Sequence, residues 1–402
     1  MKKIVYFIPT FSAISETFIL REVQTLMEFG NLDIKVLALQ EGAAKLPENI
    51  KKNVIYYRPS FFDVILAAPF ILLNLGRVIS TFKIILNENE GSFNKNVITF
   101  LKSIFYARKI KSLNPNHIHA HFLSNPSTLM MFVSSILDLP FSISGHATDV
   151  VRDHEMVKAK VKRAKFVSLC NSGAYQETIK LSGGKGRKNI ILLYHGIDYL
   201  KFKFKKRIFN TKSQIQVLAD ARFVEKKGLD ILSQAVVNLN QIFDIRLNLV
   251  GFAQNESQVS YMNSLKQIFK NASFDDKLNI PNNGKGLQQD EVANLYSECD
   301  VFIYAGIDAG KGDIDGVPNA LLQAAFSGLP VITTQSGSIS DLFDEKNSYI
   351  INQSDVNDLV IKFQEMLKDE SRLDKSDLLY KQAGKEFSLI LNVKELEGLL
   401  IK

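Results

Sequence analysis

Residues 215–230 read Ile-Gln-Val-Leu-Ala-Asp-Ala-Arg-Phe-Val-Glu-Lys-Lys-Gly-Leu-Asp, and this stretch decides the fold. The run Gln214–Ala219 is apolar and of strand length, and Gly228 allows a tight turn into a helix that begins near Leu229. A strand, a turn and a helix in this order are typical of a parallel sheet whose strands are connected through helices. Because ligands of such sheets bind beyond the carboxyl ends of the strands, the residues just after Ala219 are candidates for a binding site.

The same alternation runs through the whole chain. Glu16–Phe29 has helical spacing and Gly30 ends it, and helical stretches separate the later strands as well. We therefore expect an α/β fold of doubly wound, Rossmann-like parallel sheets with helices on both faces. The predicted strands are Lys3–Ile8, Leu32–Leu39, His117–His121, Phe141–Ser144, Phe166–Cys170, Asn189–Tyr194, Gln214–Ala219, Arg246–Gly251, Leu278–Ile280, Val301–Tyr304 and Val331–Thr333.

A chain of 402 residues suits two domains of roughly 200 residues each. The stretch 199–212 is dense in lysine and aromatic residues and interrupts the alternation, so it is predicted to be an interdomain linker. We expect a first domain over 1–198 and a second over 213–379. A last helix, 380–402, is expected to pack back onto the first domain.

Composition and charge exclude several classes of protein. The two cysteines, Cys170 and Cys299, are far apart, which argues against a disulfide framework and a zinc site and is typical of a reducing compartment. The apolar run within Met1–Pro9 is too short for a signal peptide and is interpreted as a strand. Residues 1–200 carry 25 basic and 15 acidic side chains, so an anionic partner such as a membrane surface is expected for this half. No basic and aromatic motif occurs outside the linker, so we expect no nucleic-acid partner.

The segment 59–86 is strongly apolar. Its longest uncharged run, Val64–Gly76, is too short to span a bilayer, which takes ~20 residues, and Pro69 interrupts it. Two interpretations remain. The segment either lies on a membrane surface, with Arg77 and Lys83 toward headgroups, or forms a pair of core helices under a sheet. We favour the core helices.

Candidate ligand-binding residues follow two strands of the second half. Arg222 and Lys227 flank the turn at Gly228, and two cations beside a helix N-terminus favour a diphosphate. The Gly-rich loop 305–319 follows the strand Val301–Tyr304 and leads into a helix that starts near Pro318. Asp315 in this loop provides a carboxylate for sugar hydroxyls, and Gln323 lies on the helix. The alternatives are surface cations and an acidic loop without a ligand.

Polar loops also follow strands of the first half. Ser15 is a candidate cap for the first helix, and His146 and Asp149 follow the strand Phe141–Ser144, where a histidine is more often structural. His117, His119 and His121 alternate on one strand face. Because such positions lie ~6–7 Å apart, they rarely converge on one ion, and we expect no metal site there.

Six short motifs occur in order along nearly the whole chain, and the last two are the most specific. They are Ser15-Glu-Thr-Phe18, Ile118-His-Ala-His-Phe122, Ser144-Gly-His-Ala-Thr-Asp149, Tyr194-His-Gly-Ile-Asp198, Ala221-Arg-Phe-Val-Glu-Lys-Lys-Gly228 and Asp315-Gly-Val-Pro-Asn-Ala-Leu-Leu-Gln-Ala-Ala-Phe-Ser-Gly-Leu-Pro-Val331.

These motifs resemble those of the retaining GT-B glycosyltransferases of family 4, especially members that build bacterial exopolysaccharide, capsule or lipopolysaccharide. The resemblance implies two Rossmann-like domains facing a cleft. It also implies transfer of a sugar from a UDP- or GDP-sugar to a polysaccharide or lipid-linked saccharide, with retention and without a metal or other cofactor. The expected location is the cytoplasm, peripherally at the inner face of the membrane.

The resemblance also implies roles for single residues. Catalytic roles fall to Arg222 and Lys227 on the diphosphate, to Asp315, and to His146 near the transferred sugar. Donor-binding roles fall to Gly316, Val317, Pro318, Asn319, Gln323 and Gly251, with Gln323 by the ribose. Acceptor-side roles fall to Ser15, Glu16, Thr17, His121 and Asp149.

The chain departs from the family pattern at its signature. Asp315 and Gln323 stand where the family has two glutamates, and Tyr304-Ala-Gly306 stands where it commonly has Pro-Ser after the strand. A neutral partner for the ribose weakens the contact by ~1 kcal/mol, which lowers donor affinity several-fold without abolishing it. The alternatives to a transferase are therefore a non-catalytic GT-B module that binds sugar or supports a partner transferase, and another GT-B reaction such as nucleotide-sugar epimerisation.

Overall fold

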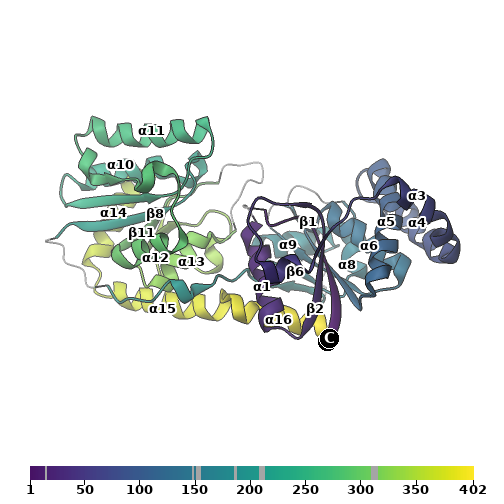
Figure 1. Cartoon of the computed structure of the whole chain (residues 1–402). Coiled ribbons are helices and arrows are strands. Elements are labelled where there is room, and N and C mark those ends of the chain that lie inside the picture. Colours follow the sequence, from purple (N-terminus) through teal and green to yellow (C-terminus); the bar gives the residue numbers. More distant parts are fainter. Residues whose placement is uncertain (14–15, 147–148, 151–154, 185–187, 208–212, 309–315) are drawn as a thin grey trace. The chain divides into compact units, whose positions relative to one another are not determined.

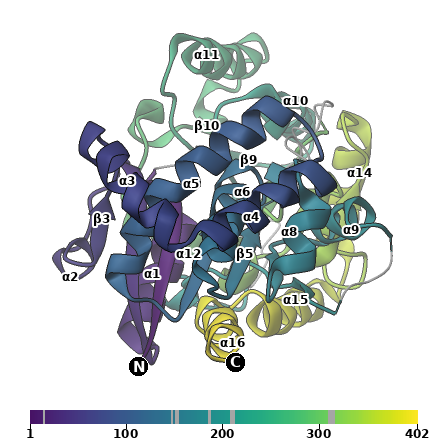
Figure 2. The ribbon, with the colours of Figure 1, turned by 90° about the vertical axis from the view of Figure 1, so that its right-hand side faces the viewer.

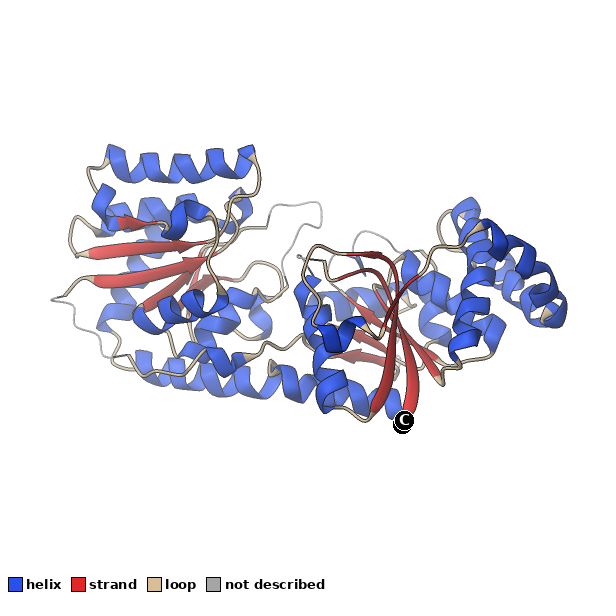
Figure 3. Ribbon diagram, viewed as in Figure 1, coloured by secondary structure: helices blue, strands red, loops and turns tan. Residues whose placement is uncertain are grey.

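The computed structural model describes residues 1–13, 16–146, 149–150, 155–184, 188–207, 213–308 and 316–402. The chain forms two compact units, each with its own parallel sheet (Figures 1 and 3). Unit 1 comprises Met1–Gly196 and Leu389–Lys402, and unit 2 comprises Ile197–Ser388.

Unit 1 contains a seven-stranded sheet in the order β3-β2-β1-β4-β5-β6-β7, in which all pairs of neighbouring strands are parallel. The strand order reverses direction between β1 and β4, which is the switch point where such sheets place ligands. The strands are β1 (Lys2–Phe11), β2 (Leu32–Glu41), β3 (Val54–Tyr56), β4 (His117–His121), β5 (Phe141–Gly145), β6 (Val167–Leu169) and β7 (Ile190–Leu192).

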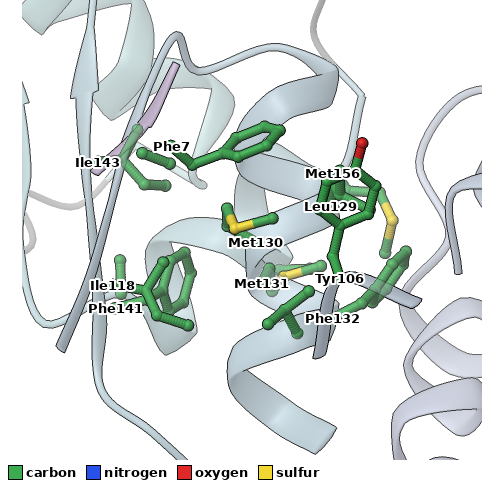
Figure 4. Close-up of a cluster of buried hydrophobic side chains, with 14 of the residues drawn as sticks. Phe7, Tyr106, Ile118, Leu129, Met130, Met131, Phe132, Phe141, Ile143 and Met156 are labelled. Carbon is green, nitrogen blue, oxygen red and sulfur yellow. The ribbon is translucent and has the colours of Figure 1, made fainter. Parts of the chain in front are cut away.

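Helices cover both faces of this sheet because successive strand residues point to opposite sides. Val5 and Phe7 of β1 pack with α5 and α6 on one face (Figure 4). Ile4, Tyr6 and Ile8 pack on the other face with α1 and α16. The helices are α1 (Thr17–Phe29), α2 (Glu48–Lys51), α3 (Phe61–Leu73), α4 (Leu75–Glu88), α5 (Phe93–Leu113), α6 (Asn125–Leu137), α8 (Val157–Arg163), α9 (Ser172–Leu181) and α16 (Leu389–Ile401).

Unit 2 repeats the plan with a six-stranded parallel sheet in the order β10-β9-β8-β11-β12-β13. Its switch point lies between β8 and β11. The strands are β8 (Ile215–Asp220), β9 (Ile245–Val250), β10 (Leu278–Asn279), β11 (Val301–Tyr304), β12 (Val331–Thr334) and β13 (Tyr349–Ile351). The α-helices are α10 (Leu229–Leu239), α11 (Glu256–Asn271), α12 (Gln289–Glu298), α13 (Asn319–Ser327), α14 (Val356–Lys368) and α15 (Arg372–Glu386).

The predicted parallel α/β fold with two sheets is confirmed, and every predicted strand is present within three residues of its expected ends. Two short edge strands, β3 and β13, were missed. The stretch 380–402, predicted as one helix that packs on the first domain, is divided: α15 ends at Glu386, and α16 begins at Leu389 and belongs to unit 1. At the break the Ile197 amide donates a hydrogen bond to the carbonyl of Phe387.

The described part of the predicted linker packs on unit 2. Tyr199 stacks on Phe326 with 4.6 Å between ring centroids. The buried guanidinium of Arg207 donates hydrogen bonds to the carbonyl oxygens of Tyr296, Ser297 and Ser327. Residues 199–207 therefore form a strap fixed to this unit.

The prediction of a buried helix pair over 59–86 is wrong for most of its apolar side chains. In α3 only Asp63, Ala67 and Phe70 are buried, while Leu73 is 83% exposed. Within the described residues no single helix is long and apolar enough to cross a bilayer. Taken together, α3 and α4 reach that length and composition, but they meet at a bend of 99°.

Candidate functional site

The turn after β8 brings Lys227 to the carboxyl edge of the unit 2 sheet. Gly228 has φ +61°, and a Cβ at this position would lie 1.9 Å from the carbonyl oxygen of Ala305, so only glycine fits without displacement. The amide of Ile307 donates a hydrogen bond to the carbonyl of Lys226 at 2.9 Å. The turn and the loop after β11 therefore hold each other in place.

Lys227 is buried although it is a cation. Its Nζ lies 3.1 Å from the hydroxyl of Tyr304, to which it donates, and 5.3 Å from the centre of the Tyr304 ring. Arg222, by contrast, is exposed. A positive charge held in a partly dry setting at a helix N-terminus interacts more strongly with an anion than a surface cation does.

A polar bridge connects the end of β8 with the first turn of α13. The buried Tyr296 hydroxyl donates to Asp220 at 3.0 Å and lies 3.3 Å from the carbonyl oxygen of Ala320. Burial raises the pKa of Asp220 to about 6, although the Tyr296 hydrogen bond and the charge of Lys227 act to lower it. The two predicted segments of the donor site are thereby joined at neighbouring strands.

Among the described residues, the first turn of α13 has no side-chain cap. Pro318, whose side chain cannot act as a cap, precedes the first helical residue, Asn319. Gln323 is half-buried, and among the described residues its Oε1 has no hydrogen-bond partner although it is buried. A buried acceptor without a partner is costly, and a ligand hydroxyl at this point would satisfy it. Gly316 and Val317 are half-buried beside this turn, whereas Asp315 lies outside the described residues.

Gly251 follows β9 at the same edge of the sheet. A Cβ on Gly251 would lie 2.1 Å from the carbonyl oxygen of Ala221, which in turn precedes Arg222. The amide of Ala221 donates to Val250 at 2.9 Å. Gly251 thus allows the backbone that carries Arg222 to run close beside β9, which is a supporting role for the predicted donor residue.

In unit 1, a line of histidines runs along the carboxyl edge of the sheet. His121 Nδ1 lies 3.3 Å from His146 Nε2, and His146 Nδ1 lies 2.9 Å from His195 Nε2. At the other end of the line, His121 Nε2 lies 3.2 Å from a carboxylate oxygen of Glu22 on α1. Burial lowers the pKa of His195 to about 4 and that of His146 well below its ordinary value, so both rings are neutral at pH 7.

Asp149 holds the backbone at His146 and at Leu123. Its carboxylate accepts hydrogen bonds from the His146 amide, at 2.6 Å, and from the Leu123 amide. Burial raises the pKa of Asp149 to about 7 against these hydrogen bonds and the nearby charge of Lys160. Asp149, predicted on the acceptor side, thus positions the backbone after β5.

The remaining acceptor-side residues lie at the start of α1. Thr17 is its first residue, and Glu16 precedes it without a side-chain cap. Burial raises the pKa of Glu16 while the charge of His121 acts to lower it. Ser15, the predicted cap, lies outside the described residues.

Two groups of unit 1 side chains have the spacing of metal ligands. His146, Cys170 and His195 form one, and Glu22, His119 and His121 form the other, with ligand atoms within 4.8 Å of one another in each. Two of the three β4 histidines, His119 and His121, thus come together with Glu22 of α1. His119 is already engaged, since its ring nitrogens lie 2.7 and 3.0 Å from the hydroxyls of Ser142 and Ser144. The absence of a metal stays a prediction.

Sequence reasoning missed several residues of these clusters. Tyr304 was noted only as a departure from the family pattern, and Tyr296 and Glu22 carried no motif. The His195 ring was part of a motif without an assigned role. A polar or aromatic residue within two positions of a strand end was the available signal for Tyr304 and His195.

Comparison with known proteins shows one matching family and several related glycosyltransferases. Residues 201–386 match the family described as glycosyl transferases group 1. The chain is 24% identical over 368 residues to the amylovoran biosynthesis glycosyltransferase AmsK of Erwinia amylovora, covering 86% of each chain. It is 22% identical over 399 residues to WcaL of Salmonella typhimurium, covering 94% of this chain and 92% of that protein.

Solved structures share the fold over the full length. HepE of Anabaena, solved in complex with UDP, has a TM-score of 0.68 at 14% identity and covers 100% of both chains. A glycosyltransferase of Rickettsia africae has a TM-score of 0.70 at 16% identity and covers 100% of this chain and 99% of its own. The expected GT-B fold class is thus confirmed, and residues 201–386 form a domain of the glycosyl transferases group 1 family.

Proposed function

We propose that the protein transfers a sugar from a nucleotide-sugar donor to a polysaccharide or lipid-linked saccharide in the synthesis of a cell-surface glycan. The observation that carries the proposal is the buried Lys227 at the turn between β8 and α10, within a glycosyltransferase group 1 domain. The name of AmsK, which refers to the synthesis of an extracellular polysaccharide, supports the class of acceptor.

The donor would be held by unit 2. Lys227 and Arg222 would bind the diphosphate, and they would stabilise the charge that develops on the leaving nucleoside diphosphate. The backbone amides at the start of α13 would face the donor, and Gln323 would accept a hydrogen bond from a ribose hydroxyl at its unpartnered Oε1. Because HepE was solved with UDP and with UDP-glucose, UDP-sugars are the first donors to test.

The proposed chemistry retains the anomeric configuration. It uses no metal, because Arg222 and Lys227 supply the positive charge that a metal would otherwise supply. His146 would lie near the transferred sugar as a neutral ring, since its lowered pKa keeps it unprotonated. Both of its nitrogens lie beside other histidines, so its position is fixed before any ligand binds.

Purified protein tested with a panel of UDP- and GDP-sugars should release nucleoside diphosphate in the presence of a saccharide acceptor. A rate unchanged by a chelator would support metal independence, and a proton spectrum of the product reads its anomeric configuration. If no donor is consumed but nucleotides raise the melting temperature, the protein is the non-catalytic binding module. Neither release nor a thermal shift with any nucleotide would contradict the donor site altogether.

Two variants test the phosphate assignment. Arg222→Ala and Lys227→Met each remove a charged hydrogen-bond donor, which contributes about 1.5–3 kcal/mol, so nucleotide affinity should fall roughly 10- to 150-fold. Lys270→Met, on the exposed side of α11, makes the same change in net charge away from this turn and should bind as the parent does. Equal affinity of Arg222→Ala and the parent would refute the role of Arg222.

A further inference from the structure

Helices α3 and α4 present large apolar side chains to solvent. We call these the α3–α4 surface. Single exposed apolar residues are ordinary on a protein, but a group of this size on two consecutive helices marks an interaction site. The surface consists of Phe61, Phe62, Val64, Ile65, Leu66, Leu72 and Leu73 of α3 and Leu75, Ile79 and Leu86 of α4.

Helical geometry gathers the α3 residues on one side. Positions four, seven and eleven residues apart lie on the same face of a helix. Phe62, Leu66 and Leu73 follow this spacing, and so do Phe61, Ile65 and Leu72 in the adjoining row. The opposite side carries the buried Asp63, Ala67 and Phe70. Asp63 forms an ion pair with Arg108 of α5, which anchors the inner side.

The same helices lie at the outside of unit 1. Figures 1 and 2 show α3 and α4 lying over α5 and α6, away from β1. The 13 residues of α3 span about 20 Å, less than the ~30 Å of a bilayer core, and the 99° bend separates α3 from α4. These helices are therefore better suited to lying flat at the surface of a bilayer than to crossing it.

The charges around this surface are mainly positive. The stretch from Arg58 to Leu113, which contains both helices, has eight basic and three acidic residues, and two of the basic ones, Arg77 and Lys95, pair with acidic residues outside it. The acidic side chains are held in ion pairs, Asp63 with Arg108, Glu88 with Arg163 and Glu90 with Lys158. Lys83 of α4 and Lys102 of α5 are exposed. An apolar face bordered by exposed cations complements a layer of acyl chains beneath anionic headgroups.

We propose that the α3–α4 surface docks on an anionic lipid bilayer, with its apolar side chains at the boundary between headgroups and acyl chains. Lys83 and Lys102 contact the headgroups. The inference goes beyond the proposed transferase function and does not depend on it, because it rests on unit 1 side chains that take no part in donor binding. It gives the enzyme a place beside a lipid-linked acceptor.

The absence of tryptophan from this chain gives a direct test. Leu73→Trp in the full chain places a single reporter on the α3–α4 surface, and Ile242→Trp places one on an exposed apolar position of unit 2. On mixing with vesicles of phosphatidylcholine and phosphatidylglycerol, the Leu73→Trp emission should shift to the blue and be quenched by brominated acyl chains. The Ile242→Trp emission should stay unchanged. An unshifted, unquenched Leu73→Trp spectrum would overturn the proposal.

Binding to vesicles tests the two kinds of contact. Replacing Phe62, Leu66 and Leu73 together by serine should lower the vesicle partition coefficient by roughly a hundredfold, whereas the matched change Ile242→Ser with Ile361→Ser should leave it unchanged. Lys83→Glu with Lys102→Glu should weaken binding to anionic vesicles only. A different result would overturn the proposal: the parent does not bind vesicles but self-associates, and the triple variant is monomeric in sedimentation. The surface is then an interface between copies of this chain.

Discussion

Gly228→Ala tests the geometry on which the donor site depends. An alanine at φ +61° costs about 1–2 kcal/mol because its Cβ crowds its own backbone. That Cβ would also lie 1.9 Å from the carbonyl oxygen of Ala305, far inside van der Waals contact. Relieving such an overlap in packed structure costs about 1–3 kcal/mol. Together the two effects should lower the free energy of unfolding of unit 2 by about 3 kcal/mol.

Thermal unfolding measures this change. For a unit of this size, 1 kcal/mol corresponds to about 2–4 °C, so the melting temperature of unit 2 should fall by about 6–12 °C. Nucleotide affinity should fall as well, because the displaced turn carries Lys227. Gly384→Ala is the control. It lies within α15, a Cβ there meets nothing within 4 Å, and alanine favours the helix, so the melting temperature should stay equal or rise.

The result that would refute this reasoning is a Gly228→Ala protein that melts within about 1 °C of the parent. It would mean that the turn and the loop after β11 separate freely, so that they do not hold Lys227 in place. A lower melting temperature with unchanged nucleotide affinity would leave the packing argument intact and contradict the link to binding.

Three further predictions concern other parts of the chain. Gln323→Glu should raise donor affinity about fivefold, measured by calorimetry, through a charged ribose contact of about 1 kcal/mol; an unchanged affinity means that Gln323 does not face the ribose. Lowering the pH from about 6.5 to about 4.5 should destabilise unit 1, because the folded pKa values of His117 (about 3) and His195 (about 4) lie below their unfolded value, so the unfolded chain binds more protons; the raised pKa of Asp149, about 7, opposes this by one proton. Unit 2 has no histidine, so its calorimetric transition should move less, and an equal shift of both transitions would contradict the assignment. Leu396→Ala in α16 should lower the stability of unit 1 by about 2–5 kcal/mol in urea unfolding, whereas the exposed Leu391→Ala should change it by less than about 0.5 kcal/mol; similar effects would show that α16 does not pack as described.

The strand and turn at 214–228 could be predicted because their signal is local. A strand pattern followed by a glycine and a helical pattern shows where the strand ends. The residues just after that end lie at the carboxyl edge of the sheet, where ligands bind. This is why Lys227 was assigned correctly to the carboxyl edge of a sheet. The contact of Lys227 with Tyr304 could not be predicted, because it depends on which strands are neighbours and on the rotamer of a ring.

The α3–α4 surface shows a different limit. A helix that is apolar on nearly every side has the same sequence pattern whether it faces a core or solvent. The sequence of residues 59–86 therefore does not show which side of the helices is buried. The inward side is identified by tertiary contacts such as Asp63 with Arg108. The line of side chains from Glu22 to His195 could not be predicted either, because its members come from separate elements that only the fold brings together.

The position of α16 in the sequence has a consequence for synthesis on the ribosome. Leu389, Val393, Leu396 and Leu400 complete the hydrophobic cluster of unit 1, yet they follow the whole of unit 2 in the sequence. All residues of unit 2, from Ile197 to Ser388, emerge before them. Unit 2 can therefore fold first, whereas unit 1 keeps an apolar face uncovered until α16 has left the ribosome.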